Sequence, residues 1–550
     1  MWHKIKNYQE TNYLRWNAFT GVGILLIIIC GIRVTLHLNH YMDILFWDES
    51  LYMTRGTQMF HSIPRDWGPS YSLWYKFLSV FISDKVTLYY FNFKLTTILL
   101  SISLFLLMLS IGVQRVLAFI IAIFSLCTFI NLPVWPHVSH YCVIVLIAGI
   151  IIAKQQQTML LKSIVFSFAL MVCAYARPEL FLAFFPILIL TYILFLSNIR
   201  QSTKKEKILM ILLTIACLVI YRFFKTPFNN GDSQRGIGVF LQHFAYNYNK
   251  WHPSKSPFWL DFFDVIRNEF KGAVSLKGLY AANPELMQRH FTSNITFYFT
   301  QISKIILSFF APIFTKDTHW LVLMVSSMLF VVYFSFTKTS KNKRRRFFAL
   351  LEDNLFTFFI LFLFTFPSVI VCIYAYPRDH YLLLQVPFLI TVITMAISSI
   401  TVEIVKPIQK IIVLATIWFF VMPVAEDFNY FELFREEHSL ANLQTVRYVQ
   451  ANLSTKDTVR MFDVEGGMIN FMSSNYTNDY YLWKRDSVQL SDFLLSQKFD
   501  IIYNTPTLTA LNCVQKDTVL FEIVKNPEKY GYYNQKTGDF KPSLLIKKKK

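Results

Sequence analysis

Cysteine is scarce in this 550-residue chain, and its distribution excludes a fold held together by disulfides. Six of the seven cysteines lie inside apolar runs, and only Cys513 lies well outside one. No cysteine spacing is typical of a disulfide framework or of a zinc site. The glycines show no phosphate-loop pattern either. A loop-rich secreted fold is therefore excluded.

Acidic residues are also few, because the chain has 34 Asp and Glu against 53 Lys and Arg, a formal net charge of +19. Nucleic-acid-binding proteins show such an excess on one surface. Here the basic residues lie mainly in short segments between apolar runs rather than on one amphipathic face. We interpret them as membrane-topology signals and expect no nucleic-acid partner.

Hydrophobic residues make up 54% of the chain and aromatic residues 17%, more than a soluble enzyme of this length can bury in one core. They form uninterrupted runs separated by short polar turns, as transmembrane helices do. The first run lacks a cleavage motif of small residues, which predicts a retained signal anchor. Eleven spans are predicted, at residues 20–36, 95–111, 117–132, 138–153, 163–176, 180–197, 208–221, 321–336, 355–374, 382–400 and 411–425.

Basic residues fall on alternate connections, which we expect to be cytoplasmic. A further apolar segment, residues 302–314, would reverse this parity if it crossed the membrane, so we interpret it as re-entrant or interfacial. The outer loops 38–94 and 222–301 then face the periplasm of a bacterial inner membrane or its equivalent. The prediction is a transmembrane domain over residues 1–425 and an outer domain over residues 426–550.

The tail changes character after residue 439, where long apolar runs give way to short mixed segments. The alternation of these segments predicts a small α/β domain. The helix-like segments are 440–453 and 490–498, and the strand-like segments are 458–462, 480–483, 499–503 and 518–524.

An acidic pair, Asp48 and Glu49, follows the first span. If residues 48–60 form a helix, Asp48, Tyr52 and Arg55 share one face. A carboxylate held at the lipid–water boundary beside aromatic rings can remove a proton from an acceptor hydroxyl. The alternative is an ordinary helix N-terminus, where acidic side chains are favoured electrostatically. Position alone gives the two interpretations equal weight.

Two arginines violate the charge rule, because Arg177 and Arg378 lie on outer connections too short to be ordinary solvated loops. A charge so near to hydrocarbon needs a partner. Each can pair locally, Arg177 with Glu179 and Arg378 with Asp379. Alternatively, both bind an anion, and a phosphate at the membrane surface suits guanidinium donors.

The histidines give little indication of a metal site. His137 and His140 lie at an outer turn, His252 and His319 are scattered, and no third ligand has a suitable spacing. We therefore assign no metal ligand, and the sequence leaves dependence on a divalent metal open.

The order of these motifs resembles the GT-C glycosyltransferases, most nearly the branch with protein O-mannosyltransferases and bacterial lipid A aminoarabinose transferases. The resemblance rests on the Asp48-Glu49 pair with Tyr52, Trp-Gly-Pro at 67–69, Arg-Pro-Glu at 177–179 and Tyr-Pro-Arg-Asp-His-Tyr at 376–381. Each motif is short, and the shared layout covers roughly the first four hundred residues. It implies an α-helical polytopic membrane fold with outer-face amphipathic helices.

The resemblance also implies an activity, the inverting transfer of a monosaccharide from a polyprenyl-phosphate carrier to a lipid, glycan or protein hydroxyl. By the family pattern Asp48 would be the general base and Glu49 would support the site. The aminoarabinose branch often has an arginine where this chain has Leu51, which leaves Arg55 to take that role. The residues expected to hold the donor phosphate are Arg55, Arg177, Arg378 and His380, with Tyr52 and Tyr381 in support.

Two other classes of function remain open on the sequence alone. A transporter or flippase of a lipid-linked glycan would use intramembrane charges to define its path. Transporters tend to show two related halves, and no such repeat is present here. A non-catalytic scaffold would use the outer α/β tail as its binding module.

Overall fold

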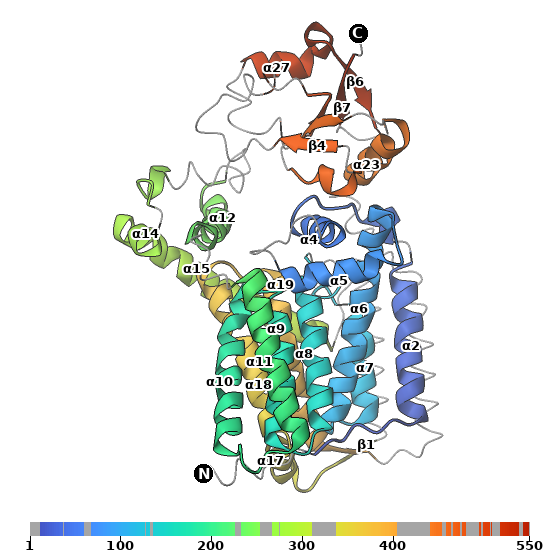
Figure 1. Ribbon diagram of the computed structural model, residues 1–550, viewed down its shortest axis with the longest axis vertical. Helices are drawn as coiled ribbons and strands as arrows, with labels where there is room; N and C mark the ends of the chain where they lie inside the picture. Colours follow the sequence, from blue (N-terminus) through green and yellow to red (C-terminus); the bar gives the residue numbers. More distant parts are fainter. Residues whose placement is uncertain are drawn as a thin grey trace.

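The computed structural model shows a bundle of apolar helices with a small C-terminal sheet beyond one end (Figure 1). The architecture is mostly helical and is compatible with a polytopic membrane protein. The structure describes residues 11–36, 38–59, 68–126, 128–132, 136–225, 233–253, 267–273, 275–310, 337–403, 440–453, 458–463, 466–473, 476–479, 494, 496, 499–505, 508, 518–537 and 543–548.

Six of the described helical segments are long and apolar enough to cross a membrane. Their main helices are α2 (Ala18–Val34), α6 (Lys85–Ser110), α10 (Phe181–Ser197), α11 (Lys204–Phe224), α18 (Leu355–Tyr374) and α20 (Val386–Ile400). Three shorter apolar helices accompany them: α7 (Arg115–Leu126), α8 (Val138–Lys154) and α9 (Met159–Ala174). The predicted spans 321–336 and 411–425 lie outside the described residues, and every other predicted span falls on one of these helices.

The outer helices of the bundle carry apolar side chains on their surface. Helix α11 buries only Glu206, Met210 and Leu213, whereas its Leu218 is 63% exposed and Leu196 of α10 is 64% exposed. In water such a surface would be an aggregation site. Hydrocarbon is the solvent that suits it, so these helices fit the lipid-facing edge of the bundle.

Side-chain caps determine where several helices begin. Asp84 accepts the N–H of Thr87 at 2.8 Å and starts α6. Thr203 and Glu206 form a capping box at the start of α11. Glu206 also accepts the hydroxyl of Thr158, the N-cap of α9, at 2.6 Å. One carboxylate thus fixes the starts of two neighbouring helices.

Two short helices, α4 (Asp48–Thr57) and α5 (Pro69–Ser79), lie between the bundle and the C-terminal sheet (Figure 1). Gly56 lets them pack closely, because a Cβ atom at this position would lie 2.4 Å from the carbonyl oxygen of Ser72. The helix expected over residues 48–60 begins at Asp48 as predicted and ends three residues early, at Thr57.

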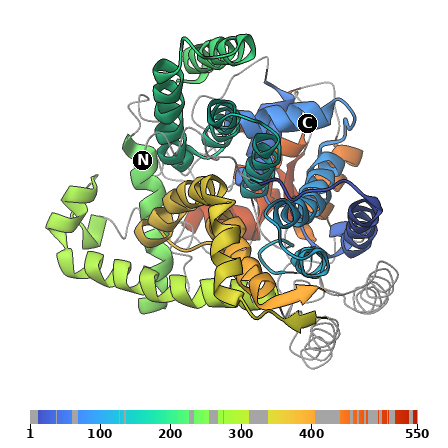
Figure 2. The ribbon, with the colours of Figure 1, turned by 90° about the horizontal axis from the view of Figure 1, so that it is seen from below.

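The outer loop 222–301 contains α12 (Ser233–Trp251), α14 (Leu276–Ala282) and most of α15 (Pro284–Ser308). Along the bundle axis these helices lie to one side, away from α2 and α6 (Figure 2). The described part of segment 302–314 continues α15 to its end rather than forming an element of its own. Residues 311–314 lie outside the described residues, and the re-entrant or interfacial placement stays a prediction.

The C-terminal region forms a five-stranded sheet in the order β4-β3-β5-β7-β6. Strand β3 runs parallel to β4 and β5, whereas β7 runs antiparallel to β5 and β6. This mixed sheet with its helix α23 (Ala441–Asn452) agrees with the predicted α/β character of the tail. The strands are β3 (Val459–Phe462), β4 (Tyr476–Asp479), β5 (Ile501–Asn504), β6 (Tyr532–Lys536) and β7 (Ser543–Lys547).

The strand predicted over residues 518–524 is wrong, because this segment is helix α27 (Thr518–Lys525). Its β-branched and aromatic composition is typical of strands. A strand would place Phe521 and Ile523 on the same face, yet Phe521 is 58% exposed and Ile523 is 1% exposed. Helical geometry separates two such positions by roughly 200°. The predicted strand 480–483 and most of the predicted helix 490–498 lie outside the described residues.

The C-terminal region is hydrogen-bonded to the loop between α2 and α4. Asp43 accepts the backbone N–H groups of Asn442 at 2.8 Å and Leu443 at 2.7 Å. These are first-turn donors of α23, so Asp43 caps this helix from a distant part of the chain. Arg447 donates to both carboxylate oxygens of Asp84, at 3.0 Å and 2.8 Å. Both contacts attach α23 to the bundle end.

Helix α4 itself touches the C-terminal region. Asn470 donates to the Ser50 hydroxyl at 2.9 Å, and its carbonyl accepts the Thr54 hydroxyl at 3.0 Å. Gly467 lies so close that a Cβ atom there would be 1.8 Å from the carbonyl oxygen of Phe46. Only glycine fits this contact without a shift of the backbone.

We predict that Gly467→Ala weakens this docking, because its methyl group meets backbone rather than a flexible side chain. Overpacking of this kind costs about 1–3 kcal/mol. The midpoint of thermal unfolding in detergent should fall, and proteolysis between α20 and α23 should accelerate. Gly238→Ala is the control, since nothing lies within 4 Å of its added Cβ. Equal midpoints for the two variants would contradict the prediction.

Candidate functional site

Glu49 is fully buried at the base of α4, where its carboxylate meets four hydrogen-bond donors. Oε1 accepts the Tyr71 hydroxyl at 2.6 Å, the Asn92 side-chain amide at 3.0 Å and the Tyr75 hydroxyl. Oε2 accepts the backbone N–H of His137 at 2.7 Å. The donors come from α5, α6 and the start of α8, so one carboxylate joins α4 to three elements.

These four hydrogen bonds limit the role that Glu49 can have in the site. Burial raises the pKa of the Glu49 carboxyl from 4.5 to about 7, against the lowering effect of the Tyr71, Tyr75 and His137 hydrogen bonds. Its side chain is 1% exposed, so no substrate reaches it without disrupting the network. The position therefore suits a residue that orients α4, which is the supporting role expected from the sequence.

Asp48 differs from Glu49 although the two are adjacent, because a helical step of about 100° turns it away from this network. It opens α4 and is half-buried. Within the described part of the chain, Asp48 forms no hydrogen bond or ion pair. It lies close enough to Tyr381 to interact with it electrostatically. Asp48 is thus the available carboxylate of the pair.

Arg177 is buried and paired with Glu179, as the local-pairing alternative predicted. Its Nε donates to Glu179 Oε1 at 2.7 Å, and Nη2 lies 2.6 Å from the same oxygen. The guanidinium also lies 4.6 Å above the centre of the Tyr381 ring. Its charge is therefore largely balanced by Glu179, and it fixes the position of Tyr381.

Arg378 behaves differently. Among the described residues it forms no ion pair with Asp379, so the close contact of the local-pairing alternative is absent, although Arg378 acts electrostatically on the Asp379 carboxylate. Its guanidinium lies 5.7 Å from the centre of the Tyr246 ring, a cation–π contact with α12. Arg378 is half-buried just before α19 (Asp379–Leu382). Since no carboxylate of the described residues lies within ion-pair distance of Arg378, its guanidinium can bind an anion.

Tyr381 lies at the centre of the site because three elements reach it. Arg177 comes from the connection between α9 and α10, Asp48 acts on it from α4, and the ring of His243 on α12 lies 6.1 Å from its ring. Helices α4, α12 and α19 occupy the same end of the bundle (Figure 1). The structure thus brings Asp48, Arg177 and Tyr381 together, as the sequence predicted.

His243 is a member of this site that the sequence did not indicate. Its Nδ1 lies 2.6 Å from the Val239 carbonyl, which can only accept, so Nδ1 carries the proton. Its Nε2 then holds a lone pair, and it has no hydrogen-bond partner among the described residues although the side chain is 4% exposed. Burial, together with the positive charges of Arg378 and Arg177, lowers the His243 pKa to about 3. The imidazole is therefore a neutral acceptor.

The other predicted site residues lie nearby or further away. Tyr52 is buried, makes an edge contact with Tyr71 at 5.2 Å and interacts electrostatically with Arg177. His380 is buried against the Tyr381 ring, at 4.2 Å. Arg55 lies in the last turn of α4, roughly 10 Å along the helix axis from Asp48. From the sequence, Arg55 is expected to take the role of the arginine that the aminoarabinose branch often has at the position of Leu51. The distance between Arg55 and Asp48 does not support this expectation.

The residues that hold Glu49 were also missed, although two carry a sequence signal. Tyr71 and Tyr75 are spaced i, i+4 on α5 and therefore share a face. Asn92 lies before the predicted span 95–111, and its place inside α6 is known only from the structure. His243 carries no comparable signal, because only the packing of α12 against α19 gives it a role.

The geometry of the described residues gives no indication of a metal site. Within the described ranges, no group of three or more His, Cys, Asp or Glu side chains could hold a metal ion. His137 and His140 stack on each other at 4.1 Å, and His137 Nδ1 lies 2.7 Å from the Thr96 hydroxyl. Both belong to the packing beneath Glu49.

The Glu49 network predicts a pH dependence of stability. Since the folded-state pKa of about 7 exceeds the ordinary glutamate value of 4.5, which applies to the unfolded chain, the folded protein binds more protons between these values. This stabilisation is fully present below about pH 4.5 and is lost as pH rises through about 7. The loss is on the order of 3 kcal/mol.

Glu49→Gln should remove this contribution and leave a flatter dependence of the thermal midpoint on pH between about 4.5 and 8. Its overall midpoint should also be lower, because the amide nitrogen of Gln faces donors. The slope is the informative quantity, and comparison with wild type in the same buffers isolates it. Parallel curves for wild type and Glu49→Gln would show that Glu49 does not titrate in this range.

Comparisons with protein-family models, with curated proteins and with solved structures found no match for this chain.

Proposed function

We propose that this protein is a membrane glycosyltransferase that moves a monosaccharide from a polyprenyl-phosphate carrier to an acceptor hydroxyl. The observation that carries the proposal is Asp48, a half-buried carboxylate without a described partner, beside a site that also holds Arg378. The site lies at one end of a bundle of apolar helices (Figure 1). A donor with a hydrocarbon tail and an anionic head suits that position.

With Asp48 as the base, the sugar can be transferred in a single displacement at its anomeric carbon. Asp48 takes the proton from the acceptor hydroxyl while its oxygen forms a bond to the anomeric carbon. The bond between that carbon and the phosphate oxygen breaks, and the electron pair leaves with the lipid phosphate. One carboxylate is sufficient for this inverting reaction, whereas retaining glycosidases need two.

The leaving phosphate would be stabilised chiefly by Arg378. Arg378 forms no ion pair among the described residues, although Asp379 interacts with it electrostatically, whereas the charge of Arg177 is paired directly with Glu179. Stabilisation of developing negative charge by a prepositioned donor is a large part of catalysis. Arg177 then acts as a positioning residue, because it holds the Tyr381 ring beneath the site.

The neutral His243 would contribute to sugar recognition. Its Nε2 is a buried acceptor without a partner in the described part of the chain, and a hydroxyl donor from a sugar would satisfy it. Leaving such an acceptor unpaired costs about 1–3 kcal/mol, so the site favours a ligand with a hydroxyl at this point. The acceptor molecule is the part that these residues do not define.

A direct test measures transfer of radiolabelled sugar from a synthetic polyprenyl-phosphate sugar by the purified protein in detergent. Labelled acceptor should form together with polyprenyl phosphate. A flippase or transporter of a lipid-linked glycan would move the donor across vesicles without cleaving it. If the donor crosses the vesicle membrane and stays uncleaved, the protein is a flippase or transporter and the transferase proposal is wrong.

Asp48→Asn should reduce transfer by at least about a hundredfold, the lower end for loss of a general base. Asn keeps the size of the side chain and removes its basicity, so insertion and donor binding should be unchanged. Glu528→Gln, an exposed acidic residue before β6, is the control. Near-normal turnover of Asp48→Asn would assign the proton to another group.

Arg378→Ala should weaken binding of polyprenyl phosphate by about tenfold to a hundredfold, the equivalent of a charged hydrogen bond of about 1.5–3 kcal/mol. The affinity is measured by titrating the lipid into purified protein. Arg200→Ala, an exposed arginine beyond the opposite end of α10, should leave affinity unchanged. If both variants bind with wild-type affinity, Arg378 is a structural cation only.

A further inference from the structure

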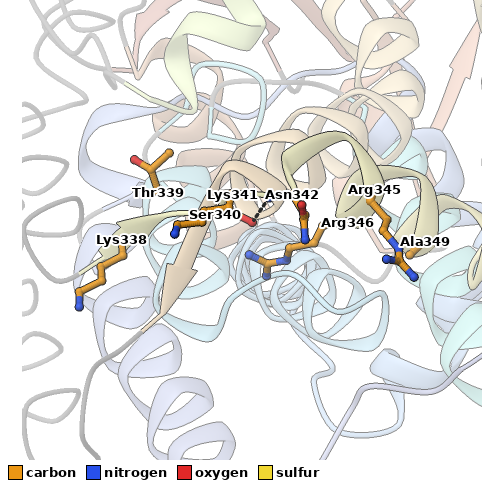
Figure 3. Close-up of a pocket in the computed structure, with 8 residues that line it drawn as sticks. All are labelled: Lys338, Thr339, Ser340, Lys341, Asn342, Arg345, Arg346 and Ala349. Atoms are coloured by element: carbon orange, nitrogen blue, oxygen red, sulfur yellow. Dashed lines mark hydrogen bonds between the residues drawn. The ribbon is translucent and has the colours of Figure 1, made fainter.

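A basic pocket lies at the end of the bundle opposite the C-terminal sheet. It is formed by the start of α17 (Lys343–Glu352) and the segment before it, which includes strand β1 (Thr337–Thr339) (Figure 3). Strand β1 pairs antiparallel with β2 (Thr401–Glu403). The pocket has a volume of about 570 Å³ and is lined by Lys338, Thr339, Ser340, Lys341, Asn342, Arg345, Arg346 and Ala349.

The charges around this pocket have one sign. Four of its eight lining residues are cationic and none is acidic. Lys343, Arg344 and Arg345 occupy the first turn of α17, which contains no acidic residue. Positive charge at a helix N-terminus is unfavourable, because the helix dipole is positive there. Asn342, the N-cap, makes no capping hydrogen bond with its side chain. An anion in the pocket would relieve this repulsion.

The inner wall of the pocket is fixed in position. Arg346 donates to the Thr401 carbonyl at 2.8 Å, and Gln114 donates to the same oxygen at 2.6 Å. The backbone N–H of Ser340 donates to the Ile400 carbonyl at 2.8 Å. These bonds connect the pocket to α7 and α20. Lys338, Lys341 and Arg345 keep exposed ammonium and guanidinium groups over a rigid base.

The rim of the pocket is apolar on one side. Phe348 is 46% exposed and lies one turn after Arg344, whose guanidinium is 5.7 Å from its ring centre. Phe348 lines the adjoining depression rather than the pocket itself, and Arg345 lines both. An exposed aromatic ring next to cations is typical of the membrane interface, where the ring meets acyl chains and the cations meet headgroups.

We propose that this pocket binds the phosphate of an anionic phospholipid. The shared chemistry is a phosphate group held by Lys341, Arg345 and Lys338, and the apolar rim favours a lipid over free phosphate. The inference is independent of the proposed transferase activity, because it concerns residues at the opposite end of the bundle. Its test therefore needs no enzymatic readout.

The experiment compares the full-length protein in nanodiscs of phosphatidylcholine alone and with added phosphatidylglycerol. Bound phosphatidylglycerol is counted by native mass spectrometry, and its affinity is obtained by titration. The double variant Lys341→Ala/Arg345→Ala should bind phosphatidylglycerol about twenty- to thirtyfold more weakly, since each basic residue at an anionic surface contributes about 1 kcal/mol.

The matched control is Lys204→Ala/Lys207→Ala, which removes two exposed lysines from the start of α11 outside the pocket. It should retain wild-type affinity. An equal loss in both double variants would reduce the effect to general surface charge and overturn the proposal. Unchanged affinity of Lys341→Ala/Arg345→Ala would overturn it too.

Two further arms complete the test. If Lys341→Ala/Arg345→Ala does not fold, Lys338→Ala/Lys341→Ala replaces it, because both of its changes lie before α17. This second variant should show the same loss of affinity. Inorganic phosphate is titrated into protein in phosphatidylcholine nanodiscs. Protection of the thermal midpoint by inorganic phosphate, without any by phosphatidylglycerol, would identify a soluble anion as the ligand and contradict the lipid assignment.

Discussion

The hydrogen-bond network of the buried Glu49 carboxyl group is the interaction on which the arrangement of the bundle end next to the C-terminal sheet depends. Its two carboxyl oxygens accept hydrogen bonds from several elements, and each of these donors would otherwise be buried without a partner. Here Tyr71, Tyr75, Asn92 and the backbone of His137 converge on one side chain. Helix α4 therefore cannot rotate or slide without breaking several hydrogen bonds at once.

This constraint extends to both faces of α4. One face carries Asp48, which interacts electrostatically with Tyr381, and the Tyr381 ring lies against Arg177. Another face carries Ser50 and Thr54, which bond to Asn470 of the C-terminal region. The helix thus connects the candidate site, the membrane bundle and the sheet, although it has only ten residues.

Much of the architecture could be predicted from the sequence because its signals are local. Apolar runs, caps and the acidic start of α4 depend on neighbouring residues, and the corresponding helices were found. The different environments of Asp48 and Glu49 were harder to predict, since they depend on which face of α4 packs against the bundle. Likewise, Arg177 forms a direct ion pair with Glu179, whereas Arg378 and Asp379 interact electrostatically without one. His243 could not be predicted, because its relation to Tyr381 exists only after α12 packs against the bundle.

The cap of α23 has a consequence for biosynthesis. Asn442 and the carboxylate that receives its N–H, Asp43, are separated by 399 positions in the chain. Chains are made from the N-terminus, and early segments fold first. The acceptor loop is thus in place long before the last segment emerges from the ribosome, and the C-terminal region completes its first helix on a surface that has already been inserted. Folding of the C-terminal region thus depends on a surface formed earlier. A chain that lacks the residues before α4 would lack Asp43, and α23 would lose this cap.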